Sequence, residues 1–133
     1  MVRIVLATLV ALVLALPVRA QNSDVVGVIT SQIEAFQNDD FETAFTYASP
    51  FIQGVFRTPE QFGQMVRRGY PMVWRPADVQ FLEQRNTDGF IYQKVLFKDA
   101  AGGLTVLEYE MLKVGETWQI NGVQRLQDPP IAA

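Results

Sequence analysis

A chain of 133 residues with a formal net charge of −3 and no cysteine or histidine leaves few kinds of chemistry open. Disulfides, the usual zinc, copper and haem ligand sets, and Ser-His-Asp or Cys-His catalysis are excluded. The acidic balance argues against nucleic-acid binding, because the basic cluster of Arg67, Arg68 and nearby Arg75 is too small for a groove. We therefore expect no metal, no cofactor and no nucleic acid.

The first twenty residues have the pattern of a secretory signal peptide. Arg3 gives a positive start, residues 4–16 form an apolar run, and Val18-Arg19-Ala20 places small residues where a signal peptidase reads them. The run is too short to span a bilayer core of about 30 Å. We expect cleavage after Ala20 and a periplasmic or secreted protein, with membrane contact only through the signal peptide; an uncleaved anchor is the alternative. Losing Arg3 and Arg19 would lower the net charge from −3 to −5.

A single domain is expected over residues 21–127, followed by a short flexible tail over 128–133. An apolar stripe predicts the first helix from Ser23 or Asp24, with Gln32, Glu34 and Gln37 pointing away from it. The stripe consists of Val25, Ile29, Ile33 and Phe36. A second helix is expected with Asp39 as N-cap and Glu42 completing a capping box, and Ser49-Pro50 stops it. Its buried face is Phe41, Ala44, Phe45 and Ala48.

The third helix has the clearest signals: Thr58 at the N-cap, Pro59 at the first helical position and Gln61 in a capping box, with Gly69 at its end. Residues 51–57 before it are ambiguous, either a turn or a short strand. Residues 69–76 combine two prolines, two aromatics and an arginine. They are interpreted either as a binding lip or lid, or as a covered crossover to the sheet with Trp74 as a plug.

From Asp78 onward the apolar period changes to two, which predicts strands over residues 79–85, 90–98, 104–113 and 117–126. Helices followed by a strand meander predict an α+β fold, with three N-terminal helices packed on a curved antiparallel sheet of four to five strands.

Matching the apolar faces of the strands predicts their register. The expected pairs are Val95 with Leu107, Gln93 with Tyr109, Lys94 with Glu108, Met111 with Ile120 and Tyr109 with Gly122. The outer face then carries a charge ladder of Lys94, Lys98, Glu108 and Glu110. A tight Asp88-Gly89 turn would place Val79 and Phe81 on that charged face. Either the loop is longer, or the sheet is buried locally on both sides.

Five segments suggest a family. They are Ile33-Glu34-Ala35-Phe36, Asp39-Asp40-Phe41 with Ala44-Phe45, Phe56-Arg57-Thr58-Pro59-Glu60, Gly69-Tyr70-Pro71, and Trp118-Gln119-Ile120-Asn121-Gly122-Val123. With the order of elements, they resemble the cone-shaped nuclear transport factor two-like superfamily, and within it small exported bacterial proteins carrying a domain of unknown function. The superfamily hosts enzymes, ligand binders and assembly modules, so the resemblance implies a fold without choosing a function. Its enzymes commonly use an Asp base, often paired with His or Tyr, and the His-dependent version is excluded here.

The mouth of such a cone lies between the helices and the inner face of the sheet. The candidate ligand-binding groups there are Tyr47, Tyr70, Gln93 and Tyr109, with Phe56 and Trp74 as walls. Phenols and an amide in an apolar cleft would orient a small apolar or aromatic ligand. The alternative is that these rings simply fill the core.

The carboxylates are interpreted mainly as structural. Asp39, Asp40 and Glu42 suit a helix N-terminus better than a metal or acid/base site, and Asp78 is the carboxylate that topology places best for acid/base work. We assign no catalytic and no metal-binding residue. The leading hypothesis is a non-catalytic domain that binds a small ligand or a partner protein. The alternatives are an assembly module that forms a homodimer through the outer sheet face, and a metal-free Tyr/Asp acid-base enzyme.

Overall fold

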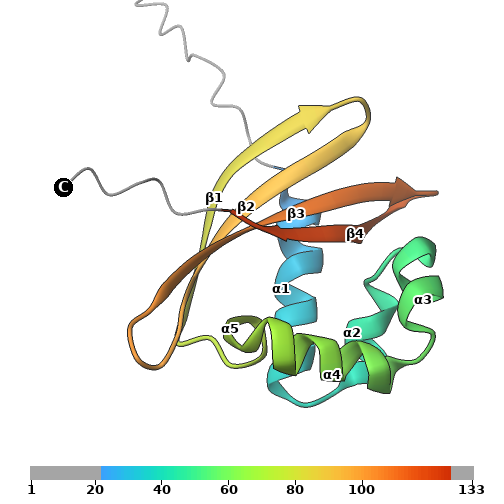
Figure 1. Ribbon diagram of the computed structural model, residues 1–133. Helices are drawn as coiled ribbons and strands as arrows, with labels where there is room; N and C mark the ends of the chain where they lie inside the picture. Colours follow the sequence, from blue (N-terminus) through green and yellow to red (C-terminus); the bar gives the residue numbers. More distant parts are fainter. Residues whose placement is uncertain (1–21, 127–133) are drawn as a thin grey trace, which may run out of the picture.

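Helices gather on one side of a twisted four-stranded sheet in the computed structural model, which describes residues 22–126 (Figure 1). The helices are α1 (Ser23–Gln37), α2 (Phe41–Thr46), α3 (Pro50–Phe56), α4 (Pro59–Gly69) and α5 (Pro71–Trp74). The strands are β1 (Asp78–Thr87), β2 (Phe90–Lys98), β3 (Leu104–Val114) and β4 (Thr117–Arg125), antiparallel in the order β1-β2-β3-β4. The predicted α+β class is confirmed, with two short helices more than the three expected. The predicted signal segment and tail lie outside the described residues.

Two helices begin and pack largely as predicted. The stripe of α1 is buried, and the Asn22 side chain caps this helix by accepting hydrogen bonds from the backbone N–H groups of Asp24 and Val25. The Thr58 hydroxyl accepts from the backbone N–H of Gln61 at 3.2 Å, which confirms it as the N-cap of α4. No helix within residues 22–126 is long and apolar enough to cross a membrane.

The other helices differ from the prediction. The N-cap of α2 is Asp40, whose carboxylate accepts from the backbone N–H of Thr43 at 3.1 Å, whereas Asp39 lies outside the helix with a left-handed φ of 55°. Residues 50–56 form α3 because Ser49 caps it and Pro50 occupies the first turn, where proline needs no amide hydrogen. Helix α2 ends at Thr46, before Pro50, so the proline that was expected to stop α2 instead starts α3.

Close approach of two helices depends on one glycine. A Cβ added to Gly63 of α4 would lie 2.6 Å from the nearest ring atom of Phe41, which begins α2. That separation is well below van der Waals contact, so α4 can rest on this ring only because residue 63 lacks a side chain.

Most of the predicted sheet register is confirmed. Val95 faces Leu107, Gln93 faces Tyr109, Lys94 faces Glu108 and Met111 faces Ile120. The Lys94 ammonium nevertheless forms its ion pair with Glu83 at 2.8 Å, and Glu108 pairs with Arg85 at 3.4 Å. The charge ladder is thus paired mainly with β1.

Two bulges explain where the register prediction was wrong or undecided. In β4, Asn121 is an extra residue, so Tyr109 faces Val123 and Gly122 faces Glu110 instead. In β1, the register shifts by one residue between Phe81 and Gln84. This shift keeps the Asp88-Gly89 turn tight and returns Val79 and Phe81 to the inner face, opposite Phe97 and Val95. Neither alternative weighed for β1 was therefore correct.

Candidate functional site

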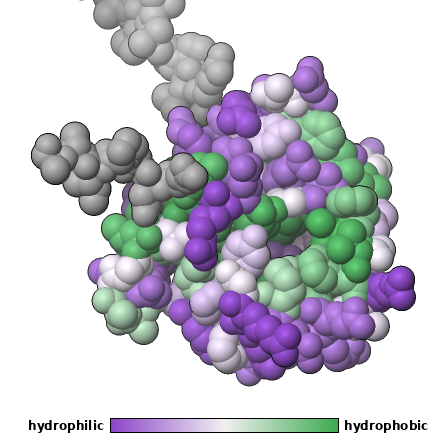
Figure 2. All heavy atoms as spheres, in the orientation of Figure 1, coloured by the Kyte–Doolittle hydropathy of each residue, from purple (hydrophilic) through white to green (hydrophobic). Residues whose placement is uncertain are grey.

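A cavity of about 330 Å³ opens between the helices and the inner face of β3 and β4. Its apolar lining comprises Phe36, Ala48, Phe51, Ile52, Phe56, Phe62, Met65, Val66, Val73, Ile120 and Val123. This volume falls at the lower end of the roughly 300–1,000 Å³ typical of small-molecule pockets. Figure 2 shows apolar surface at the edge of the molecule where α3 lies, around a hollow.

Helix α3 forms the mouth of this cavity. It is joined to the sheet through a bridge in which the backbone N–H of Ser49 donates to the carbonyl of Ile120, and that of Ile120 donates to the carbonyl of Tyr47, each at 2.8 Å. None of the α3 residues is fully buried, and Phe51 keeps 68% of its surface exposed. The mouth is therefore both apolar and open to water.

Three polar side-chain groups in the cavity wall lack a hydrogen-bond partner within residues 22–126. The Gln32 amide is almost fully buried, and its Nε2 donates to the Ala44 carbonyl at 3.1 Å while its Oε1 makes no hydrogen bond. The hydroxyl groups of Tyr70 and Tyr109 also make none. The fourth polar group, Asn121, is satisfied: its amide oxygen accepts from the Ser49 hydroxyl, and its Nδ2 donates to Glu110.

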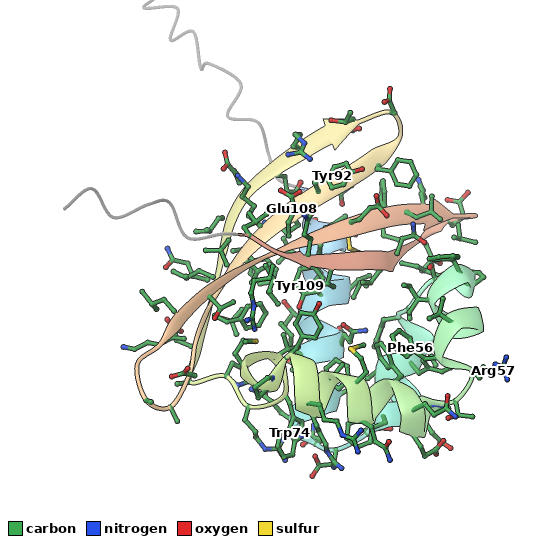
Figure 3. The ribbon with its side chains drawn as sticks, viewed as in Figure 1. Phe56, Arg57, Trp74, Tyr92, Glu108 and Tyr109 are labelled. Atoms are coloured by element: carbon green, nitrogen blue, oxygen red, sulfur yellow. The ribbon has the colours of Figure 1, made fainter. Side chains whose placement is uncertain are left out.

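Tyr109 lies between the sheet and the helices (Figure 3) and is 1% exposed. Burial, and secondly the nearby Tyr70 phenol, raises the pKa of Tyr109 well above its ordinary value. The hydroxyl consequently stays protonated and neutral at physiological pH, as a hydrogen-bond donor and acceptor without charge.

Aromatic packing supports the wall opposite the sheet. Phe62 of α4 stands at the centre of this packing, with ring centroids 5.7 Å from Phe36, 5.3 Å from Phe45 and 5.7 Å from Phe56. Tilted pairs at these distances are favourable beyond the area that they bury.

Half of the predicted ligand-binding residues line the cavity, namely Phe56, Tyr70 and Tyr109. Tyr47 lies elsewhere, in a shallow depression between α1 and the β3–β4 turn that it shares with Trp118. It is kept there because its backbone carbonyl is used in the bridge to Ile120.

Trp74 is also outside the cavity, at the far end of the helical layer (Figure 3). Its indole Nε1 donates to the Asp39 carboxylate at 2.9 Å, and Arg75 and Arg67 lie over its ring at 4.3 and 5.0 Å. Both oxygens of Asp39 also accept from Arg75. The hydrogen bond from Trp74, followed by Arg75 and Arg67, lowers the pKa of Asp39 despite some desolvation. This arrangement fastens the 69–76 segment and favours the crossover interpretation over a lid.

Gln93 is fully buried beneath the β1 bulge. Its Nε2 donates to the carbonyls of Leu82 at 3.0 Å and Lys94 at 2.8 Å. The side chain thus serves the irregular backbone of the sheet. Gln93 does not line the cavity. The sequence does not indicate this, because the position of its side chain depends on the bulge in β1.

Gln32 and Asn121 line the cavity but were not among the predicted residues. Gln32 was expected to point away from the core, but it lies three residues after Ile29 and four before Phe36, so it shares their buried face. That spacing was a usable signal. Asn121 reaches the cavity wall through the bulge, for which the sequence carries no comparable sign.

Carboxylates take no part in the cavity lining of the described chain. Asp78 is exposed at the start of β1, and Asp40 is used as a helix cap, with its pKa lowered by hydrogen bonds from Thr43. Within residues 22–126, no group of three or more acidic side chains is arranged to hold a metal ion. The cavity therefore offers neutral hydrogen bonding in apolar surroundings.

Comparison with known proteins identifies a family and a fold. A family model for a domain of unknown function, DUF4864, matches residues 18–133. Among solved structures, the chain is similar to an NTF-2-like protein of unknown function from Shewanella oneidensis MR-1, at 13% identity and a TM-score of 0.52, covering 77% of this chain and 96% of that one. This similarity shows the fold, and the family match confirms the domain of unknown function expected from the sequence. No curated protein matches the sequence significantly.

Proposed function

This chain belongs to the DUF4864 family of domains of unknown function, and we propose that it binds a small, largely apolar ligand in the cavity beside α3. One observation carries the proposal. Three neutral polar groups, on Gln32, Tyr70 and Tyr109, face an otherwise apolar cavity and have no hydrogen-bond partner within the described residues. A few polar groups in an apolar wall are the usual composition of a ligand site.

Buried polar groups normally find hydrogen-bond partners, because an unsatisfied one costs about 1–3 kcal/mol. The three cavity groups keep some contact with solvent, because none of their atoms is among the fully buried unpaired ones. A bound molecule that displaced this solvent would therefore have to supply their hydrogen bonds. The lack of a carboxylate in the described lining favours binding over acid-base catalysis.

Filling the cavity tests the proposal. Met65 of α4 lines the cavity and is half-buried, so Met65→Trp adds bulk there with little strain on the core. Gln64→Trp, at the exposed neighbouring position on the same helix, is the matched control. We expect wild type and the control to be stabilised by members of a panel of uncharged apolar compounds, and Met65→Trp to lose this response.

Thermal unfolding is a suitable measurement. A ligand at ten times its Kd stabilises the folded state by about 1.4 kcal/mol, which raises the Tm of a domain of this size by several degrees. Unchanged Tm values across a broad panel, with direct binding absent by calorimetry, would refute the proposal.

A homodimer through the outer face of the sheet is the second candidate. Leu104 on β3 is 59% exposed, and all the helices lie on the opposite side of the sheet. Lys94 is paired with Glu83 and Glu108 with Arg85 on this face, so the interface would be polar around an apolar margin. Sedimentation velocity decides this: Leu104→Glu should convert a dimer to monomer, and a wild-type monomer at high concentration would rule it out.

We propose further that the protein is exported and is periplasmic or secreted. Its support is the signal-like pattern of residues 1–20. Mass spectrometry of the protein recovered from a bacterial host should find a chain that begins at Gln21 outside the cytoplasm. A full-length chain retained at the membrane would favour the uncleaved anchor.

A further inference from the structure

The cavity changes in polarity from its buried end to its mouth. At the buried end are Gln32, 3% exposed, and Tyr109, 1% exposed. At the mouth is Phe51, 68% exposed, with the half-buried Ile52 and Phe56 beside it. A solvent-facing mouth is ordinarily polar and a buried end apolar, so this cavity has the reverse order.

The polar groups at the buried end are neutral. The unpaired groups are the Tyr109 hydroxyl and the Gln32 amide oxygen at the buried end, and the hydroxyl of the half-buried Tyr70 near Tyr109. No Lys, Arg, Asp or Glu is among the cavity-lining residues in the described chain. An anionic head group entering here would lose its hydration without gaining a cation, which is strongly unfavourable.

We propose that the cavity takes an uncharged amphiphile head first, with a hydroxyl at the buried end and an aliphatic tail leaving past α3. This inference rests on the proposed function and names the class of its ligand. A hydroxyl group both donates and accepts hydrogen bonds, so it matches a site that offers phenol hydroxyls together with a carbonyl oxygen. The persistent protonation of Tyr109 is consistent with this pairing.

The tail accounts for the exposed apolar mouth. An aliphatic chain lying along α3 would cover the ring of Phe51, which otherwise faces water. Each methylene buried in this way should strengthen binding by about fourfold. Affinity should accordingly rise along a series of primary alcohols until the chain passes beyond the mouth.

Isothermal titration calorimetry with 1-octanol and octanoate at pH 8 tests the head group. We expect 1-octanol to bind and octanoate to bind at least about a hundredfold more weakly. Tyr109→Phe should weaken 1-octanol binding by about tenfold, because one hydrogen bond is lost. Tyr47→Phe makes the same change outside the cavity and should leave the affinity unaltered.

The orientation is tested by an eight-carbon alcohol that carries a nitroxide at its far end. In NMR spectra of the protein, this probe should broaden the amide signals of Phe51 and Ile52 more than those of Gln32 and Tyr109. The opposite pattern, or octanoate binding as tightly as 1-octanol, would overturn the head-first inference and leave the proposed function intact. Absence of binding by every probe, including the alcohols, would instead overturn both.

Discussion

Replacing Tyr109 by phenylalanine should stabilise the unliganded protein while weakening ligand binding. The hydroxyl of Tyr109 makes no hydrogen bond within residues 22–126, although the side chain is 1% exposed. Removing it relieves a desolvated polar group at nearly constant volume. Such a group costs about 1–3 kcal/mol, and we expect a gain of about 1 kcal/mol because the cavity leaves the hydroxyl some access to water.

The matched comparison is Tyr92→Phe on the neighbouring strand. The Tyr92 hydroxyl donates to the Glu110 carboxylate at 3.0 Å on the outer face of the sheet, so its removal should lower stability. The same chemical change therefore has opposite signs at the two positions. Urea unfolding followed by circular dichroism measures the change in the free energy of unfolding of both variants. In thermal unfolding, the gain at Tyr109 should raise Tm by about 4–8 °C. A loss of stability in Tyr109→Phe of the same size as in Tyr92→Phe would refute the reasoning.

Three further predictions concern packing and pH. Gly63→Ala should destabilise the domain by about 1–3 kcal/mol, because the new methyl group meets the Phe41 ring. Gly54→Ala, where a methyl group on α3 meets no neighbouring atom, should instead stabilise the domain by about 0.5–1 kcal/mol. Equal effects of the two substitutions in urea unfolding would contradict this packing. Since burial raises the pKa of Tyr109, stability should fall as the pH rises above about 10, where the unfolded state loses the proton first, and Tyr109→Phe should remove that component. The lowered pKa of Asp39 contributes stability that is present above pH 3.8 and lost as the pH falls through the folded-state value. The free energy of unfolding of Asp39→Asn should therefore decline less steeply than that of wild type as the pH is lowered. The same decline in both proteins would count against the Trp74 and Arg75 contacts.

Sequence patterns predicted the fold well wherever the signal was periodic. The helical stripe of α1, the cap of α4 at Thr58 and the pairing of Val95 with Leu107 all follow from spacing and turn chemistry. Bulges escape this reasoning, because one extra residue such as Asn121 reverses the facing of the later residues in its strand without altering composition. The prediction for Pro50 failed differently, since a proline is compatible both with the end of a helix and with the start of another.

The candidate site was harder to predict than the fold. Large amphipathic residues near the helix–sheet junction are equally suited to a cavity wall and to structural contacts elsewhere. Tyr109 lines the cavity, whereas Gln93 holds the carbonyls of a bulge and Trp74 holds Asp39. Which of these roles a residue takes depends on bulges and on the left-handed backbone at Asp39, and neither leaves a periodic signal.

The cluster of Asp39, Trp74 and Arg75 has a consequence for how quickly a ligand could enter and leave. It fastens the α5 end of the helical layer with hydrogen bonds and a stacked guanidinium, whereas α3 at the other end buries none of its residues. Local opening therefore requires less free energy at α3 than at α5. Amide hydrogens of α3 should exchange faster than those of α5. The dissociation rate of a ligand should follow the rate at which α3 opens.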